Sequence, residues 1–321
     1  MSLLSQFLAG AAQLSRAAVG AGLGLGLVFS AIPDAALART ADLIQDEAVV
    51  SAEPPRPALW VVRDADSTIY LFGTVHLLRP GHDWMTPAVT EAFNASEALW
   101  LEIEDPQDQA AATPLIMQHG LSPQTPLSSR LSAEEFAELD RAAQAMGLSG
   151  VAMDPMRPWL AAINLSVAPL VQAGFDPEAG VDVVLRGHAL EAGKPIHGLE
   201  TMEQQLMFFA NLSPEDELDF LRSTLENYEQ GVALLDQMAS AWSAGDPDTL
   251  YALGGDDLKA EYPTIYEVIL TRRNADWVGQ IQQELAGDGT VFMAVGALHL
   301  AGPDSVQAQL EAQGVRVERV Q

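Results

Sequence analysis

The chain has 321 residues, of which 48% are hydrophobic and 19% are charged, and its formal net charge is -28. This length and apolar content are enough for a hydrophobic core, in one large domain or two small ones, and they exclude a disordered chain. Sixteen basic residues against 44 acidic ones argue against nucleic acid and anionic membrane surfaces as partners, because clustered Lys and Arg bind both. The absence of cysteine excludes disulfides, thiolate metal sites and a cysteine nucleophile, so any bound metal has nitrogen and oxygen ligands.

Residues 1–38 have the features of a secretory signal peptide. Arg16 precedes an apolar, Gly/Ala-rich run from 17 to 32, and Ala36 and Ala38 occupy the -3 and -1 positions of an A-x-A cleavage site. The apolar run is shorter than the roughly 20 residues that a membrane span needs. We therefore expect an exported protein, periplasmic or secreted, with no stable membrane span after cleavage. An uncleaved N-terminal membrane anchor is the alternative.

A polar, proline-bearing leader (39–57) precedes what we predict to be a single domain (58–321). Short, largely apolar segments predict strands at 58–63, 68–72, 98–104, 194–197, 291–295 and 315–320, and the turn residues 64–67 make the first two a hairpin. Three- and four-residue apolar spacing predicts helices at 132–146, 177–192, 214–241 and 263–285. The expected fold is therefore α/β, with α+β as the alternative. It has a mixed central sheet with strands from both ends of the chain, and a large helical insertion at about 105–285.

One short pattern, G-x-x-H-L-x-x-P, occurs twice in the chain. It includes Gly73 and His76 in the first copy, and Gly296 and His299 in the second, each directly after an apolar strand. A glycine there lets the backbone approach a ligand closely, which makes Gly73 and Gly296 candidate cofactor-binding residues. The imidazoles would project at the edge of the sheet where α/β proteins bind ligands. Two histidines that only hydrogen-bond loop backbone are the alternative, which the matched pair makes less attractive.

Carboxylates are predicted near the same edge. Alternation along the strand 98–104 puts Glu102 and Glu104 on one face at its carboxyl end, where buried carboxylates need a partner or a cation. A solvated strand end is the alternative, above all for Glu104. Glu200 is predicted on a loop before a helix, because Thr201 and Gln204 have the spacing of a capping box. Its alternative role is favourable electrostatics at the helix N-terminus.

Five segments together resemble the TraB/PrgY/GumN family, which includes the animal Tiki proteins. They are Gly73-Thr-Val-His76, Glu102 after its apolar strand, Gly198-Leu-Glu200-Thr, Arg273-Asn274, and Gly296-Ala-Leu-His299. The resemblance implies a fold related to the erythromycin-esterase and haem-binding ChaN-like group. In the Tiki branch it also implies divalent-metal-dependent peptidase activity. Glu104 stands where relatives more often carry Asp. Asp182 and Arg186 match a family segment too, although their i,i+4 spacing also suits a surface ion pair.

These observations lead to one leading hypothesis, an exported, metal-dependent, peptidase-like hydrolase. His76, His299 and Glu102 would hold a divalent ion (Zn, Mn, Co or Fe), with positions open for water and substrate. Glu200 or Glu104 would be the general base, and Arg273 would stabilise the oxyanion. Asn274 would orient a ligand or a neighbour. The substrate is a peptide or a small molecule. The alternatives are a non-catalytic haem- or iron-binding protein and a metal-free, histidine-dependent esterase.

The predicted helices at 105–190 and 201–285 carry large, adaptable apolar side chains. They are Met153, Met156, Trp159, Met202, Met207, Phe208 and Phe209. These side chains could form a roof over the site, which would exclude water and set specificity. The alternative is ordinary core packing, the usual position of such side chains on helices.

Overall fold

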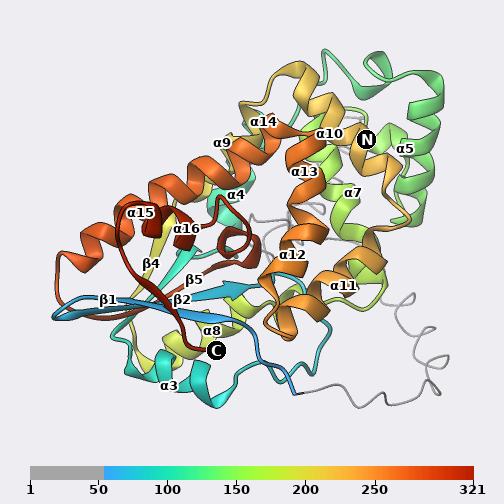
Figure 1. Ribbon diagram of the computed structural model, residues 1–321. Coiled ribbons are helices and arrows are strands. Elements are labelled where there is room, and N and C mark those ends of the chain that lie inside the picture. The colour runs from blue at the N-terminus through green and yellow to red at the C-terminus, as the bar shows by residue number, and fades with distance from the viewer. Residues whose placement is uncertain (1–53) are drawn as a thin grey trace, which may run out of the picture.

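The computed structural model describes residues 54–321 and shows an α/β domain around one mixed sheet (Figure 1). The predicted signal peptide and the leader up to residue 53 lie outside the described residues. The strand order is β4-β3-β5-β2-β1-β6. The strand bounds are β1 Leu59–Arg63, β2 Ser67–Thr74, β3 Ala98–Ile103, β4 Ile196–Glu200, β5 Gly289–Gly296 and β6 Val317–Arg319. The predicted mixed sheet, with strands from both ends of the chain and a large helical insertion, is confirmed.

Two strand pairings position the rest of the chain. β1 and β2 form the predicted antiparallel hairpin, whose turn is closed by Asp64, because its carboxylate accepts the backbone N–H groups of Asp66 and Ser67. β2 and β5 run parallel along their whole length, with Thr74 opposite Gly296. The two glycine–histidine boxes, more than 200 residues apart in sequence, therefore leave the sheet side by side.

Helices cover both faces of the sheet and make three layers. α3 (Pro87–Ala95) and α8 (Val181–Ala192) pack on one face, and α15 (Arg272–Leu285) and α16 (Val306–Ala312) pack on the other (Figure 1). Successive strand residues point to opposite faces, so in β5 Phe292 packs toward α3 and α8, whereas Met293 packs toward α15 and α16.

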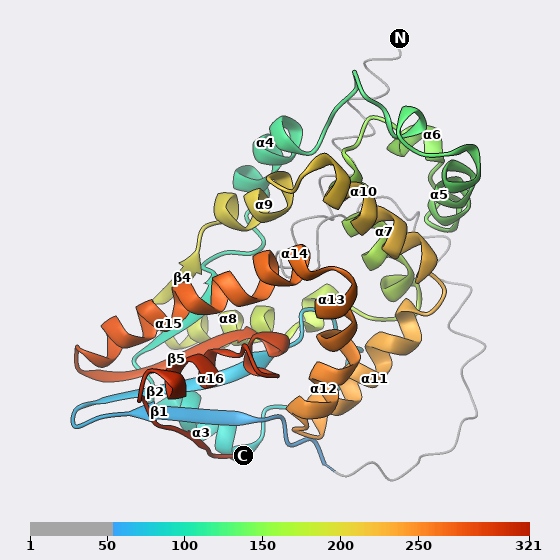
Figure 2. The same cartoon turned by 45° about the horizontal axis from the view of Figure 1, so that its top comes forward.

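The helical insertion lies beyond the edge at which β3 and β4 end (Figure 2). Its helices are α4 Gln109–His119, α5 Ala133–Ala145, α6 Gly150–Met153, α7 Pro158–Gln172, α9 Met202–Ala210, α10 Pro214–Glu226, α11 Gly231–Ser243, α12 Pro247–Gly254, α13 Asp256–Glu261 and α14 Pro263–Tyr266. Several of them share a hydrophobic core of their own. Met153, Met156, Trp159 and Met202 are buried in that core, and Met207 and Phe209 pack against it. Six of the seven candidate roof residues are therefore core residues.

The predicted helices differ from the observed ones at three places. Residues 214–241 form two helices, α10 and α11, instead of one. The helix predicted at 177–192 begins with the 3₁₀ turn Pro177–Ala179, before α8 starts at Val181. The helix predicted at 263–285 contains a π-helical segment, Glu267–Thr271, between α14 and α15. None of the helices formed by residues 54–321 has the length and apolar character that a membrane crossing requires.

Candidate active site

The candidate residues gather where β2, β3, β4 and β5 end. These four strands are parallel, so their carboxyl ends meet at one edge of the sheet. His76 follows β2, Glu102 lies near the end of β3, Glu200 is the last residue of β4, and His299 is on the 3₁₀ turn after β5. Glu200 is thus a strand residue and not, as predicted, a loop residue. The predicted capping box of Thr201 and Gln204 is present directly after it.

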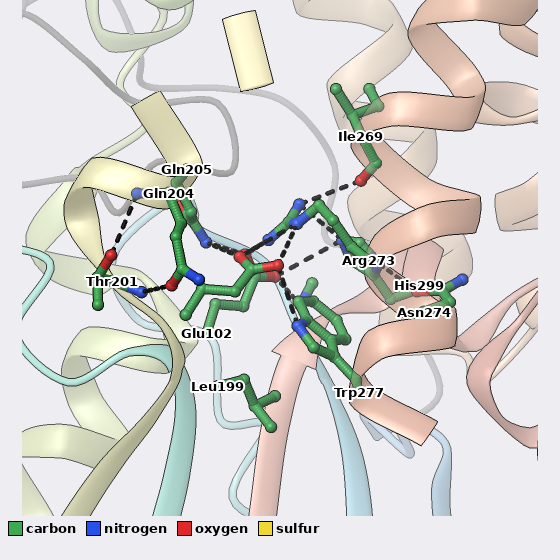
Figure 3. Close-up of polar contacts among 12 residues, drawn as sticks. Glu102, Leu199, Thr201, Gln204, Gln205, Ile269, Arg273, Asn274, Trp277 and His299 are labelled. Atoms are coloured by element: carbon green, nitrogen blue, oxygen red, sulfur yellow. Dashed lines mark hydrogen bonds and ion pairs between the residues drawn. The ribbon is translucent and has the colours of Figure 1, made fainter. Parts of the chain in front are cut away.

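Arg273, on α15, is the cation at the centre of this cluster (Figure 3). Its guanidinium donates to Glu102 Oε2 at 2.6 Å and to Glu200 Oε1 and Oε2 at 2.9 Å. Its Nη1 donates to the carbonyl of Ile269 and lies 3.1 Å from His299 Nε2. All five guanidinium hydrogens therefore have acceptors, and Arg273 is only 4% exposed.

The two glutamates respond differently to this cation. Burial alone would raise the pKa of Glu102, but Arg273, the neighbouring histidines and the N–H of Gly296 hold it well below its ordinary value. For Glu200, burial outweighs the hydrogen bonds from Arg273 and raises its pKa. Glu102 is thus firmly ionised, and Glu200 is the carboxylate that takes up a proton more readily.

The π-helical segment directly precedes Arg273 and shapes its surroundings. The N–H of Arg272 bonds to the carbonyl of Glu267, five residues back. One turn before Arg273, the carbonyl of Ile269 accepts from the Arg273 side chain. Single π turns in helices occur frequently at functional sites because they redirect the residues around them. Here the segment connects α14, whose Ile265 and Tyr266 are buried, to the two site residues Arg273 and Asn274.

His299 is held in one orientation and one tautomer. Its Nδ1 lies 2.5 Å from Oδ1 of Asn274, whose Nδ2 in turn donates to the carbonyl of Asp304 at 2.8 Å. Because Asn274 presents its oxygen, Nδ1 of His299 carries the hydrogen and Nε2 keeps its lone pair. Burial and the charge of Arg273 lower the pKa of His299 to about 3, so the ring is neutral. Its Nε2 lies 3.9 Å from Glu102 Oε1.

His76 has a carboxylate partner on α8. Its Nδ1 lies 3.2 Å from Asp182 Oδ1, an ion pair without hydrogen-bond geometry. Burial alone would lower the pKa of His76, but the close contact with Asp182 and the negative charge of Glu102 together outweigh burial and raise the pKa to about 9. Asp182 and Arg186 therefore have different partners, since Arg186 pairs with Asp105 at 2.6 Å.

The two glycines of the boxes have different roles. Gly296 donates its N–H to Glu102 Oε1 at 2.7 Å. A Cβ atom on Gly296 would lie 3.0 Å from Glu102 Oε1, 3.5 Å from His299 Cδ2 and 3.6 Å from His76 Nε2. At Gly73 a Cβ atom would meet Ala297 at 3.0 Å. Gly296 thus leaves space among the three candidate ligands, whereas Gly73 allows the two boxes to approach each other.

One candidate lies outside the cluster, and one cluster residue was not predicted. Glu104 is exposed beyond the end of β3, and its backbone carbonyl accepts from Arg186. Gln205 is fully buried, and its Nε2 donates to Glu102 Oε2 at 3.0 Å and to Glu200 Oε2 at 2.9 Å (Figure 3). The capping box could have indicated it, because a helix that starts at Met202 brings residue 205 back toward Glu200.

The donor set fits a divalent ion in its chemistry. His299 turns its Nδ1 toward Asn274 Oδ1, and the Nδ1 of His76 lies 3.2 Å from Asp182 Oδ1, so the two Nε2 atoms are the candidate metal donors. Glu102 Oε1, His76 Nε2 and the ring of His299 come together around Gly296. Within residues 54–321, however, no group of three or more His, Asp or Glu side chains has an arrangement that could hold a metal ion. Arg273 Nη1 lies 3.1 Å from His299 Nε2, so a metal ion could use that nitrogen only if Arg273 moved away.

The fold and site define a class of α/β proteins with two glycine–histidine boxes and a buried Arg–Glu cluster at one sheet edge. The chain belongs to the TraB/PrgY/gumN family, whose family model matches residues 58–319. It is 26% identical to the uncharacterized protein YbaP of Escherichia coli (strain K12) over 257 residues, which are 79% of this chain and 92% of that protein. YbaP of Shigella flexneri matches with the same identity and coverage. No solved structure matches the chain at a significant level.

Proposed function

We propose that this protein is a metal-dependent hydrolase whose divalent ion (Zn, Mn, Co or Fe) is held by His76, His299 and Glu102. The observation that carries the proposal is the close approach at Gly296, where Glu102 Oε1, His76 Nε2 and the ring of His299 come together. When bound, such an ion would polarise a carbonyl and lower the pKa of a water molecule.

The neighbouring residues have definite roles in this proposal. When His299 Nε2 acts as a ligand, the Nη1 hydrogen that Arg273 directs at it becomes free to stabilise an oxyanion. Glu200 holds the guanidinium in place from two sides. Its raised pKa also suits Glu200 to accept a proton, and it lies in the cluster whereas Glu104 does not. Asn274 fixes the orientation of His299.

Substrate class and location are further parts of the proposal. A peptidase-like reaction is what the resemblance to the metal-dependent members of the family implies. The net charge of -28 favours neutral or basic substrates and partners. The proposed export depends on residues 1–38, and mass spectrometry of the mature protein tests it, with Arg39 as the expected first residue.

Metal analysis of the purified protein tests the main proposal. We expect one divalent ion per chain, and His76→Ala and His299→Ala should each lower metal affinity about 100-fold or more. His188→Ala is a matched control, because His188 is exposed on α8, and it should leave the affinity unchanged. A wild-type protein without a bound divalent ion, together with unchanged affinity in both site variants, would contradict the proposal.

Two other functions use the same residues and make different predictions. The pair of His76 and Asp182 favours a metal-free esterase, because a carboxylate can orient a histidine base. Such an enzyme would keep full activity in chelator, whereas the proposed enzyme would lose it. A haem-binding protein would show a shifted Soret band on titration. The cavity beside the cluster has a volume of ≈10 Å³, which is far too small for a macrocycle.

A further inference from the structure

A small cavity with both apolar and polar lining lies beside the cluster, between β2, β3, α8 and α9. Its polar lining comes from Thr74, His76, Glu102, Asp182 and Gln205. Its volume of ≈10 Å³ is room for about one water-sized group. Seven buried side-chain atoms in residues 54–321 have no hydrogen-bond partner, and four of them belong to residues that line this cavity. Buried polar atoms are normally satisfied, so this concentration indicates a ligand site.

The amide of Gln205 can be oriented with certainty from its neighbours. Its Nε2 donates to two carboxylates, Glu102 at 3.0 Å and Glu200 at 2.9 Å. The reverse orientation would place an amide oxygen against two carboxylate oxygens, where no hydrogen is available. Oε1 of Gln205 is therefore a buried acceptor without a donor.

Two more oxygen atoms of the cavity lining lack a hydrogen bond. Thr74 is 2% exposed, and its Oγ1 has no partner. Asp182 Oδ1 lies 3.2 Å from His76 Nδ1 without hydrogen-bond geometry, and it has a second lone pair to spare. Together with Gln205 Oε1, these atoms make three oxygen acceptors around a space of one water molecule.

The charge around the cavity favours a cation. Three carboxylates surround the cavity: Glu102 and Glu200 pair with the guanidinium of Arg273, and Asp182 pairs with His76. Even with His76 protonated, the group keeps a net negative charge. Negative clefts concentrate cations, and the acidic chain as a whole adds to this effect.

We propose that Thr74, Asp182 and Gln205 form a subsite for a primary ammonium group, R–NH3+. Such a group has the size of a water molecule, three N–H donors for the three oxygen acceptors, and a positive charge. Its carbon chain leaves through the open side of the cavity. The subsite rests on the proposed function only for its place in a reaction, because ammonium binding itself needs no metal.

Ligand-observed NMR on the full chain in excess chelator tests the subsite without the metal. n-Butylammonium should bind saturably, whereas tetramethylammonium, which has the charge but no N–H donor, should not. L-Alaninamide distinguishes the source of the group. If it binds as well, a peptide amino terminus fits; if it does not, an unbranched alkylamine such as a lysine side chain is the ligand. Loss of metal binding would refute the proposed function, but not this result.

Three variants show whether the named oxygens hold the amine. Thr74→Val should weaken n-butylammonium binding about tenfold or more, because one charge-assisted hydrogen bond is lost. It should not lower the melting temperature, because the hydroxyl has no partner in the fold. Thr74→Ser should restore binding. Thr224→Val is the matched control and should leave n-butylammonium binding unchanged, because the Thr224 hydroxyl lies on α10, where it donates to the Phe220 carbonyl.

Asp182→Asn gives a second, independent measurement, and it should also weaken binding about tenfold. Three results would each overturn the proposal. The first is that neither primary amine binds, which would leave a cavity for water only. The second is that n-butylammonium and tetramethylammonium bind equally well. The third is that Thr74→Val and Asp182→Asn both leave the affinity for n-butylammonium unchanged.

Discussion

Removing the central cation should destabilise the protein strongly. In Arg273→Met the side-chain length is kept, but Glu102 and Glu200 lose their only guanidinium partner. Glu102 is 7% exposed and the side chain of Glu200 is also 7% exposed, so water cannot replace the lost partner. Breaking a buried ion pair from one side costs about 3–5 kcal/mol, because an uncompensated charge is left behind. We expect a loss in this range in the free energy of unfolding.

A compensating variant separates charge from packing. In Arg273→Met with Glu102→Gln and Glu200→Gln, no buried charge remains unpaired, and an uncharged replacement of a buried ion network is often neutral. The triple variant should therefore recover most of the lost stability. Urea unfolding followed by circular dichroism, in chelator at one pH, measures all forms. Arg222→Met is the control, because Arg222 pairs with Glu135 and Asp219 at the surface, where such pairs contribute about 1 kcal/mol or less.

Two outcomes would refute this reasoning. If Arg273→Met changes the free energy of unfolding by less than about 1 kcal/mol, the cluster is solvated and Arg273 is not its essential counter-charge. If the triple variant is no more stable than Arg273→Met, the loss comes from packing around Phe208 and Trp277, whose rings contact the guanidinium, and not from unpaired carboxylates.

Three further predictions concern the same cluster, and urea unfolding measures all of them. Gly296→Ala should destabilise the protein by about 1–3 kcal/mol, because the added Cβ atom overpacks against Glu102. Gly187→Ala is the control and should stabilise α8 slightly, because its Cβ atom meets open space. Equal effects of the two variants would contradict the close approach of Glu102 to Gly296. Deleting Val268 removes the extra residue of the π turn and rotates α14 by about 100° relative to Arg273. The burial of Ile265 and the contacts of Arg273 cannot then both persist, so we expect a loss of stability. Unchanged stability would refute the role of the π segment. In metal-free protein, folding lowers the pKa of His299 to about 3. The stability that this neutral ring contributes is therefore present above pH 6.5 and is lost as the pH falls toward 3, and His299→Gln should remove that pH dependence. Folding raises the pKa of His76 to about 9, so its stabilising contribution is present below pH 6.5 and is lost as the pH rises through 9. His76→Gln should remove this second pH dependence. A wild-type stability that does not change with pH would contradict both histidine predictions.

The sheet could be predicted because its strands alternate, and because turn residues separate them. The buried helix α7 could not, since eleven of its fifteen residues are buried and it has no polar face to reveal a helical period. The helix predicted at 214–241 was too long because apolar spacing continues across 227–230, where the chain ends α10 and starts α11. The π segment leaves no sequence signal, because it changes the hydrogen-bond ladder and not the residue types.

The candidate site could be predicted as far as local patterns reach. The repeated glycine–histidine box indicated His76 and His299, and strand alternation indicated Glu102. The partners of these residues were out of reach, because they come from distant segments. Asp182 approaches His76 from α8, and Gln205 approaches Glu102 from α9. The spacing of Asp182 and Arg186 suited a local ion pair, but the fold gives each a more distant partner.

The cluster holds more negative charge than its own residues neutralise, which is unfavourable inside a protein unless a cation is bound there. Both proposed ligands meet this imbalance, but they need different atoms. A divalent ion needs the imidazole lone pairs and Glu102 Oε1 around Gly296, whereas an ammonium group needs the oxygens of Thr74, Asp182 and Gln205. If the two ligands occupy adjacent places, n-butylammonium should still bind saturably to metal-loaded protein, but more weakly, because the ion removes part of the negative charge. Mutually exclusive binding would place both at one position, and then the three oxygens could not form a separate subsite.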